Sequence, residues 1–214
     1  MTPTRLNDLL FARYGELNWW PAGTPYEVMV GAVLTQNTAW SNVEAAIARF
    51  GSSGCGLNLT PQRIETMPIE ELTEIIRPAG FFNQKARYIK ALTAWFKQYN
   101  YSTEAARRAG LPELRKELLA VRGIGKETAD SILLYALELP SFVTDAYTKR
   151  LLGRLGVTGV SGYDAVKRFF EEGLDTKLYN NLHAMIVINA KEHCRAKPKC
   201  AGCPLEDYCE KGNK

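Results

Sequence analysis

Four of the five cysteines gather near the end of the chain, in the segment CRAKPKCAGCPLEDYC. Thiolates are soft ligands that suit zinc or iron–sulfur clusters. Structural zinc sites use two short-spaced pairs, whereas this spacing, C-x5-C-x2-C-x5-C, has one short pair between two longer arms. It favours a loop around a [4Fe–4S] cluster, in which each cysteine reaches a different iron. Zinc and unligated thiols are the alternatives. The candidate ligands are Cys194, Cys200, Cys203 and Cys209.

The residues around these cysteines add positive charge. Arg195, Lys197 and Lys199 lie between the first two cysteines, so a rigid loop would present three cations to a phosphate backbone. A solvated basic loop is the alternative interpretation. Cys55 stands alone in GSSGCGLN and is interpreted as a spare thiol. The two histidines, His183 and His193, are both expected to be structural.

A second chemical feature is the glycine turn in LLAVRGIGKETADSIL. Gly123 and Gly125 can adopt backbone angles that other residues resist, and they let the backbone approach a ligand closely. The amides of Gly125, Lys126 and Glu127 stand at a helix N-terminus, which favours an anion. The glycine spacing fits neither a P-loop nor a dinucleotide fingerprint. The helical context and Lys126 favour binding of a nucleic-acid backbone over a purely structural turn.

The elements that must position these features are helical nearly throughout. Apolar residues recur at helical spacing, and prolines and glycines mark the ends. Only residues 141–144, SFVT, have strand character. The pattern predicts an all-α fold of ten or so short helices, with a boundary at 140–144. The expected helices span 25–36, 42–50, 68–80, 83–99, 111–123, 127–137, 145–156, 163–173 and 178–194.

Composition narrows the class of protein. The chain of 214 residues is 46% hydrophobic and 23% charged, which is typical of a globular protein and not of a disordered one. A net charge of +4 permits a polyanionic partner without requiring one. The N-terminal run has no signal-peptide pattern, and no apolar stretch reaches the ~18 residues of a membrane span. A cytoplasmic monomer with reduced thiols and no membrane contact is expected.

Three separated motifs carry a resemblance to a known family. LLAVRGIGKETAD, then VTDAYTKRLLGRLG, then the cysteine loop, resembles the helix-hairpin-helix (HhH-GPD) DNA glycosylases of the endonuclease III superfamily. The resemblance covers about residues 19–209, with the motifs in the right order. It implies a six-helix barrel with the helix-hairpin-helix at 24–139. It also implies a second helical subdomain, 1–23 plus 140–214, that carries an iron–sulfur cluster loop, with a DNA-binding groove between the two.

The resemblance also implies roles for single residues. Asp145 corresponds to the catalytic aspartate, and the four cysteines to the ligands of a [4Fe–4S] cluster. The first arm of the cysteine loop is one residue shorter than is usual in the family. A monovalent cation is implied at the hairpin carbonyls of Leu119, Val121 and Ile124. The hairpin contacts to double-stranded DNA are implied at Gly123, Gly125, Lys126 and Thr128.

Glu127 departs from the bifunctional members of that family, which carry a lysine nucleophile at this position. A carboxylate cannot form a Schiff base. Lys126 is one residue away, and one residue rotates about 100° around a helix, so it should point toward the phosphates. The departure predicts a monofunctional glycosylase in which Asp145 supports attack by water.

The N-terminal segments resemble the type III branch of 3-methyladenine DNA glycosylases, through WWPAGTPYEVMVGAVLTQNTAW and RPAGFFNQKA. That branch typically lacks the cysteine loop, so the chain mixes features. By this resemblance Gln36 fills the gap left by a flipped base, and Phe81 wedges between bases; a core position is the alternative for Phe81. Trp19, Trp20 and Trp40, with Glu127, are the expected base pocket, although WWP could simply pack the N-terminal arm.

These features predict a base-excision repair glycosylase acting on alkylated purines such as 3-methyladenine. Electron-rich indoles stack well on a cationic base. One alternative is an endonuclease III-type glycosylase and lyase acting on oxidised pyrimidines. Another is a non-catalytic DNA-binding iron–sulfur module.

Overall fold

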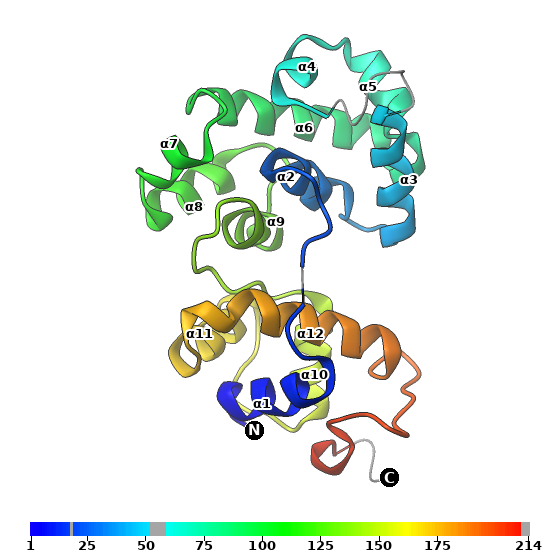
Figure 1. The fold of residues 1–214 in the computed structure, drawn as a ribbon, viewed down its shortest axis with the longest axis vertical. Helices are drawn as coiled ribbons and strands as arrows, with labels where there is room; N and C mark the ends of the chain where they lie inside the picture. The colour runs from blue at the N-terminus through cyan, green and yellow to red at the C-terminus, as the bar shows by residue number, and fades with distance from the viewer. Residues whose placement is uncertain (18, 52–58, 211–214) are drawn as a thin grey trace. The chain divides into compact units, whose positions relative to one another are not determined.

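A computed structural model of the chain describes residues 1–17, 19–51 and 59–210 (Figure 1). Cys55 lies outside the described residues. Every regular element in these ranges is a helix, which confirms the all-α prediction. Residues 141–144 belong to no helix and form no strand with any described segment. The chain divides into two compact units, Ala22–Leu139 and Met1–Pro21 with Pro140–Lys214. Among the helices described, none combines the length and the hydropathy needed to cross a membrane.

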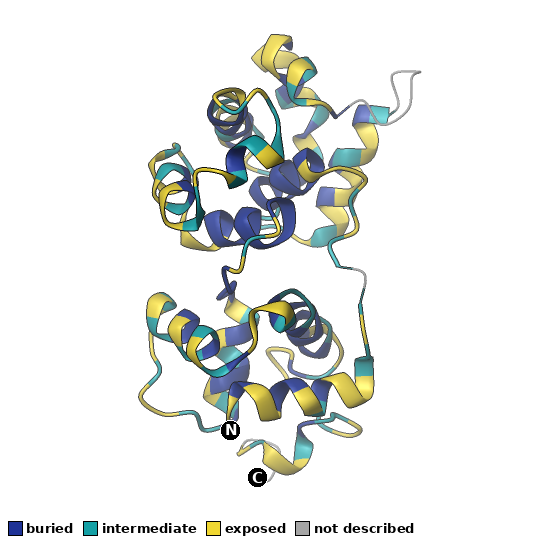
Figure 2. Ribbon diagram, turned by 60° about the vertical axis from the view of Figure 1, so that its left-hand side comes forward, coloured by how far each residue is buried: buried dark blue, intermediate teal, exposed yellow. Residues whose placement is uncertain are grey.

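The unit Ala22–Leu139 is built around α2, in which every residue except the first is buried. Helix α2 packs against α3, α6, α9 and η2, and the surrounding helices turn one buried face inward and one exposed face outward (Figure 2). Its elements are α2 (Pro25–Leu34), α3 (Trp40–Gly51), α4 (Pro61–Thr66), α5 (Ile69–Ile75), η1 (Arg77–Ala79), α6 (Phe82–Lys97), α7 (Thr103–Arg107), α8 (Leu111–Ala120), α9 (Lys126–Ser131) and η2 (Ile132–Ala136).

Two predicted helices of this unit are divided in the structure. The segment 68–80 forms α5 and then the 3-10 turn η1, because Pro78 disfavours the α conformation at the residue before it. The segment 127–137 begins as α9 and continues as a single π-helical turn, η2. This turn shifts the register of the chain where it packs on α2.

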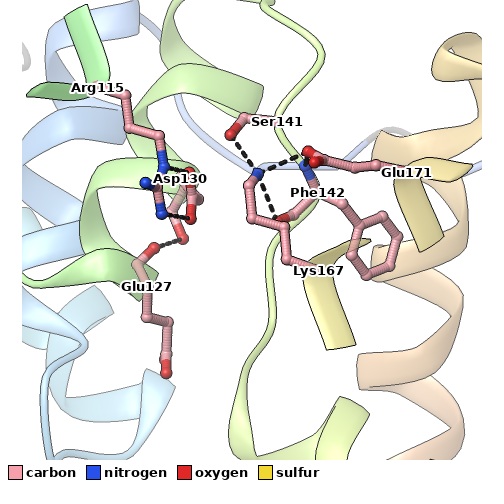
Figure 3. A network of polar contacts seen from close by, with 8 residues as sticks. Arg115, Glu127, Asp130, Ser141, Phe142, Lys167 and Glu171 are labelled. Carbon is pink, nitrogen blue, oxygen red and sulfur yellow. Dashed lines mark hydrogen bonds and ion pairs between the residues drawn. The ribbon is translucent and has the colours of Figure 1, made fainter. Parts of the chain in front are cut away.

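Helices α8 and α9 form the hairpin around the glycine turn. The guanidinium of Arg115 donates two hydrogen bonds to the carboxylate of Asp130, at 2.8 and 3.1 Å (Figure 3). Asp130 is fully buried, so this bidentate pair compensates the cost of its burial and fixes the two helices to each other.

The second unit is centred on α12, which packs against α1 and α10, while α1 also packs against α11. Leu6 and Leu10 of α1 are fully buried and provide its inner face. The elements of this unit are α1 (Pro3–Tyr14), α10 (Ala146–Arg154), α11 (Tyr163–Gly173), η3 (Thr176–Leu178), α12 (Tyr179–Glu192) and η4 (Glu206–Tyr208).

Three helices begin at a Thr-Pro pair: α1, α2 and α4. In each, the threonine hydroxyl accepts a hydrogen bond from a backbone N–H of the first turn, and the proline occupies a position whose N–H has no helical partner. Helices α1 and α4 were not among the expected elements, although this pair marks both of them. The five-residue helix α7, capped by Ser102, was also not expected.

Candidate functional site

Asp145 caps the N-terminus of α10. Its Oδ1 accepts a hydrogen bond from the backbone N–H of Thr148 at 2.7 Å, and only 9% of the residue is exposed. Its Oδ2 lies 3.6 Å from Nε2 of His183, which is buried on α12 of the same unit. The expectation that Asp145 starts a helix is confirmed, and the same carboxylate faces an imidazole that the sequence interpretation considered only structural.

The environment of Asp145 favours its ionised form. Burial alone would raise the pKa of this carboxyl group, but the nearby imidazole of His183 lowers it, and the hydrogen bond from the Thr148 amide lowers it further. The net result is a pKa below the ordinary value of an aspartate. A buried carboxylate that stays charged can stabilise positive charge that develops beside it.

A second polar network holds the segment that leads into Asp145. Nζ of Lys167 lies 2.6 Å from Oγ of Ser141 and 2.6 Å from Oε1 of Glu171, and donates to the carbonyl of Phe142 at 3.3 Å. The same Glu171 oxygen accepts the backbone N–H of Phe142 at 3.0 Å (Figure 3). Helix α11 therefore fixes residues 141–142, and the ring of Phe142 stacks on Phe170 with centroids 4.1 Å apart.

The two glycines of the turn differ in what they require. Gly123 has φ of +87°, and a Cβ there would lie 2.2 Å from the ring of Tyr88, so both its conformation and its space demand glycine. Gly125 has φ of −89°, an ordinary extended conformation, and a Cβ there would meet nothing within 4 Å. The expectation of an unusual backbone angle is therefore wrong for Gly125, whose exposed backbone is instead open to close approach.

Gln36 lies against the hairpin. Its Nε2 donates to the carbonyl of Gly123 and to Oγ1 of Thr128, both at 3.0 Å. Thr128 is buried, so its hydroxyl supports the Gln36 loop from within the unit. Of the predicted cation ligands, the Val121 carbonyl already accepts the N–H of Ile124 at 3.1 Å. The DNA contacts of Gln36 and Thr128, and the cation at Leu119, Val121 and Ile124, stay predictions.

Phe81 stands at the start of α6 with an exposed ring. It follows Gly80, has φ of +47°, and is 65% exposed. A phenylalanine in the left-handed region is strained, and such strain is concentrated at functional positions. The alternative of a core aromatic residue is wrong, whereas its role as a wedge stays a prediction.

Lys126 and Glu127 form the exposed first turn of α9. The backbone carbonyl of Glu127 accepts the hydroxyl of Ser131 at 2.8 Å, so the main chain at Glu127 is part of the helix (Figure 3). Neither lysine nor any other amine occupies position 127. The phosphate contact of Lys126 and the place of Glu127 in a base pocket are not tested by these contacts.

Trp19 and Trp20 line a pocket of about 470 Å³ in the unit that holds Asp145. This volume lies in the ~300–1,000 Å³ range of small-ligand sites. Nζ of Lys191 stands 5.7 Å from the ring centroid of Trp19, so this indole already attracts one cation. Trp40 belongs to the other unit, where it begins α3 half-buried. The remaining lining residues are Glu16, Leu17, Lys177, Asn180 and Asn181.

The four cysteines of the C-terminal segment line one cavity together with apolar side chains from α10 and the loop. None of the four forms a disulfide with another described residue; Cys194 is buried and the other three are partly exposed. Burial raises the pKa of Cys203, and the proximity of the other three cysteines raises it further. Nη1 of Arg154 donates to Sγ of Cys194 at 3.1 Å, and Nε of Arg150 donates to the Cys194 carbonyl at 2.8 Å.

The cysteines are gathered, but not tightly enough for one ion. In the ranges that the structure describes, no three His, Cys, Asp or Glu side chains are arranged to hold a single metal ion. Nδ1 of His193 lies 3.0 Å from the Lys199 carbonyl, so this nitrogen is paired with the backbone and not with the cysteines. Arg195, Lys197 and Lys199 are exposed, as a phosphate-binding surface would require.

Comparison with known proteins identifies the family to which the chain belongs. The profile of the HhH-GPD superfamily base excision DNA repair proteins matches residues 30–176. A protein of Methanocaldococcus jannaschii, described as a candidate DNA repair glycosylase, is 45% identical over 210 residues, covering 96% of this chain and 94% of that protein. The H. pylori 3-methyladenine DNA glycosylase bound to 1,N6-ethenoadenine has a TM-score of 0.76 at 28% identity, covering 90% of this chain and 98% of that one.

A second solved structure supports the fold alone. A trapped endonuclease III–DNA covalent intermediate has a TM-score of 0.80 at 24% identity, covering 100% of this chain and 98% of that one. The similarity therefore extends over both compact units.

Proposed function

The chain belongs to the HhH-GPD superfamily of base excision DNA repair proteins, and from this premise we propose that it is a monofunctional DNA glycosylase. The proposed reaction is hydrolysis of the N-glycosidic bond of a damaged base in double-stranded DNA. The observation that carries the proposal is Asp145, a buried carboxylate held by the Thr148 amide and faced by His183. The products are a free base and an abasic site.

In this reaction the glycosidic bond breaks with its electron pair leaving on the base, and the sugar develops oxocarbenium character. The charge of Asp145 stabilises that positive centre and orients a water molecule, whose oxygen bonds to C1′ while its released proton passes to solvent water. A lowered pKa keeps Asp145 ionised throughout, so its role is electrostatic support together with orientation of the water.

Glu127 supports the monofunctional part of the proposal. Strand cleavage by a bifunctional glycosylase needs an amine that attacks C1′ and forms a Schiff base. Glu127 places a carboxylate where bifunctional members of the family have the lysine. Lys126 is one residue earlier on α9, so its side chain leaves the helix about 100° away from that of Glu127.

Alkylated purines are the proposed substrates. Trp19 and Trp20 supply electron-rich faces to one pocket, and stacking an indole on a cationic base contributes ~1–2 kcal/mol. The similarity to a 3-methyladenine glycosylase of H. pylori supports the same class of base. Such bases already carry positive charge, so they leave the sugar more readily than neutral ones.

We assign the four C-terminal cysteines to a [4Fe–4S] cluster, which would be structural. All four line one cavity, in which Arg154 donates to Sγ of Cys194 and Arg150 donates to the Cys194 backbone carbonyl. A [4Fe–4S] cluster takes one thiolate at each of its four irons, and the four cysteines that line this cavity can supply them. Once bound, the cluster would hold Arg195, Lys197 and Lys199 as one rigid cationic surface for the DNA backbone.

Release of free bases in parallel tests the proposal. Duplexes carrying alkylated, oxidised or deaminated bases are incubated with the wild-type protein and with Asp145→Asn, and the free bases are quantified. We expect release of alkylated purines by the wild type and a loss of about 100-fold or more in Asp145→Asn. Preferential release of an oxidised or deaminated base would overturn the substrate assignment. Equal release by both proteins would remove Asp145 from the mechanism, and no release from any duplex would favour a non-catalytic DNA-binding module.

A further inference from the structure

Lys85 is a buried cation that has no part in the proposed glycosylase mechanism. It lies in the first turns of α6, only 2% of the residue is exposed, and it occupies the same buried stripe as Ile89, Leu92 and Phe96. Its Nζ donates to the carbonyl of Leu34 at 2.8 Å and to the carbonyl of Ala79 at 2.7 Å. Burying a charged group costs folding free energy unless hydrogen bonds or an opposite charge compensate it, and here two carbonyls accept from the ammonium group.

The two carbonyls belong to the ends of two different elements. Leu34 is the last residue of α2 and Ala79 is the last residue of η1. Carbonyls at helix ends carry partial negative charge and have no partner further along the helix, so an ammonium group suits them. One side chain therefore joins the points at which two separate loops leave the core of the unit.

Each of these loops leads directly to a strained residue and a candidate DNA contact. The first loop holds Gln36 and then Asn37, whose φ is +52°, and the second holds Gly80 and Phe81, whose φ is +47°. Non-glycine residues keep such angles only where the surroundings impose them. Lys85 is the side chain that bonds to the chain just before both loops.

We propose that Lys85 is a positioning residue that holds the Gln36 loop and the Phe81 loop in the arrangement needed to enter DNA together. The inference rests on the proposed function, because it gives Gln36 and Phe81 their roles as plug and wedge. Loops that are ordered before binding do not lose conformational freedom when DNA binds, so the bond network of Lys85 strengthens recognition of a distorted site.

Burial gives this cation a second property. Removal from water lowers the pKa of Lys85 to about 8, so its charge is retained at neutral pH at a cost to the folded state. Both hydrogen bonds persist in the neutral amine, since that form also has two N–H groups to donate. We therefore expect the hydrogen bonds from Lys85 to Leu34 and Ala79 to persist at moderately alkaline pH.

Lys90, also on α6, provides a matched control. Its Nζ donates to the carbonyls of Ile64 and Met67, at 2.6 and 2.5 Å, and so closes the end of α4 as Lys85 closes the end of α2. Neither carbonyl leads to the Gln36 loop or the Phe81 loop. Lys85→Met and Lys90→Met thus remove similar carbonyl-bound ammonium groups from the same helix.

The experiment compares binding of two duplexes by the wild type, Lys85→Met and Lys90→Met, using fluorescence anisotropy. One duplex carries a tetrahydrofuran abasic-site analogue, and the other is undamaged. The ratio of the two affinities isolates loop insertion from phosphate contacts, and a loss of stability alone would not change it. We expect this ratio to fall about tenfold in Lys85→Met and to stay within twofold of the wild type in Lys90→Met.

The other outcomes separate the two proposals. A ratio in Lys85→Met equal to that in Lys90→Met would overturn the positioning role and leave the glycosylase proposal intact. A wild-type protein with no preference for the abasic duplex would overturn both. If Lys85→Met does not fold, Lys85→Gln, which can still donate to one of the two carbonyls, is judged by the same ratio.

Discussion

At the level of single residues, Asp145 depends on two partners, a backbone amide that fixes one oxygen and an imidazole that faces the other. The amide belongs to the helix that Asp145 caps, so the sequence position alone could suggest it. His183 comes from α12, far along the chain, and no periodic pattern links the two. A buried histidine on an apolar helix is ordinarily a packing residue, so the sequence alone does not indicate that His183 faces Asp145.

His183→Gln should shift the pH dependence of base release. His183 lowers the pKa of Asp145 against the effect of burial, so its removal lets burial raise that pKa. Because the carboxylate must be ionised, the acid limb of the activity profile should move to higher pH in the variant. Single-turnover base release measured against pH provides the profile.

His193→Gln is the control for this change, since it removes the only other histidine of the chain and leaves Asp145 untouched. Its acid limb should coincide with that of the wild type. An unchanged acid limb in His183→Gln would mean that the imidazole has no influence on the ionisation of Asp145.

At the level of elements, the hairpin between α8 and α9 shows why a glycine motif cannot be interpreted residue by residue. The motif predicts unusual backbone angles at both glycines, but only Gly123 has a positive φ. The ring of Tyr88 on α6 also leaves no room for a side chain at Gly123. That packing partner lies outside the motif. Gly125 has an ordinary backbone angle, and no described atom lies within 4 Å of a Cβ built there. The lack of a side chain at Gly125 therefore matters for the approach of a ligand to its backbone.

Gly123→Ala and Gly125→Ala should therefore separate stability from binding. Gly123→Ala forces a methyl group onto the Tyr88 ring in a left-handed backbone and should lower the free energy of unfolding by at least ~1 kcal/mol. Gly125→Ala should change it by less than ~0.5 kcal/mol. The added methyl group should nevertheless weaken DNA binding, because it stands where a phosphate would approach the amides.

Chemical denaturation and DNA titration of the two variants measure these effects. The interpretation would be wrong if Gly125→Ala bound duplex DNA as tightly as the wild type, or if both substitutions destabilised the protein equally.

The cysteine loop makes a prediction of its own. Protein purified without oxygen should contain iron and sulfide and absorb in the visible blue, and Cys203→Ala should remove most of that absorption. Chelation of the iron should loosen the loop and weaken DNA binding, since Arg195, Lys197 and Lys199 lose their rigid support. A colourless protein with zinc as its only bound metal would contradict the cluster assignment.

At the level of the whole molecule, helical periodicity and terminal signals were sufficient to predict an all-α fold, and the family resemblance is confirmed. The sequence did not reveal the π-helical turn of η2, because its register depends on packing against α2. Helix α1 is not among the predicted helices, although Thr2 and Pro3 mark its start. Lys85 interrupts an apolar stripe on α6, a signal that was present but whose partners only the fold brings together.

The proposed monofunctional reaction depends on the side chain at position 127. If the chain is monofunctional, its lack of strand cleavage follows from Glu127 and not from a distorted hairpin, since Arg115 and Asp130 hold α8 and α9 together. Glu127→Lys would then restore an amine at the family's nucleophile position, on an exposed first helical turn that tolerates either side chain.

Borohydride trapping on a duplex that contains an abasic site is the most direct test. The wild-type protein and Glu127→Lys are incubated side by side with the labelled duplex and the reductant, and covalent adducts are resolved by denaturing electrophoresis. We predict no adduct for the wild type and a covalent adduct for Glu127→Lys. A wild-type adduct would contradict it and would show that another amine of the chain attacks C1′.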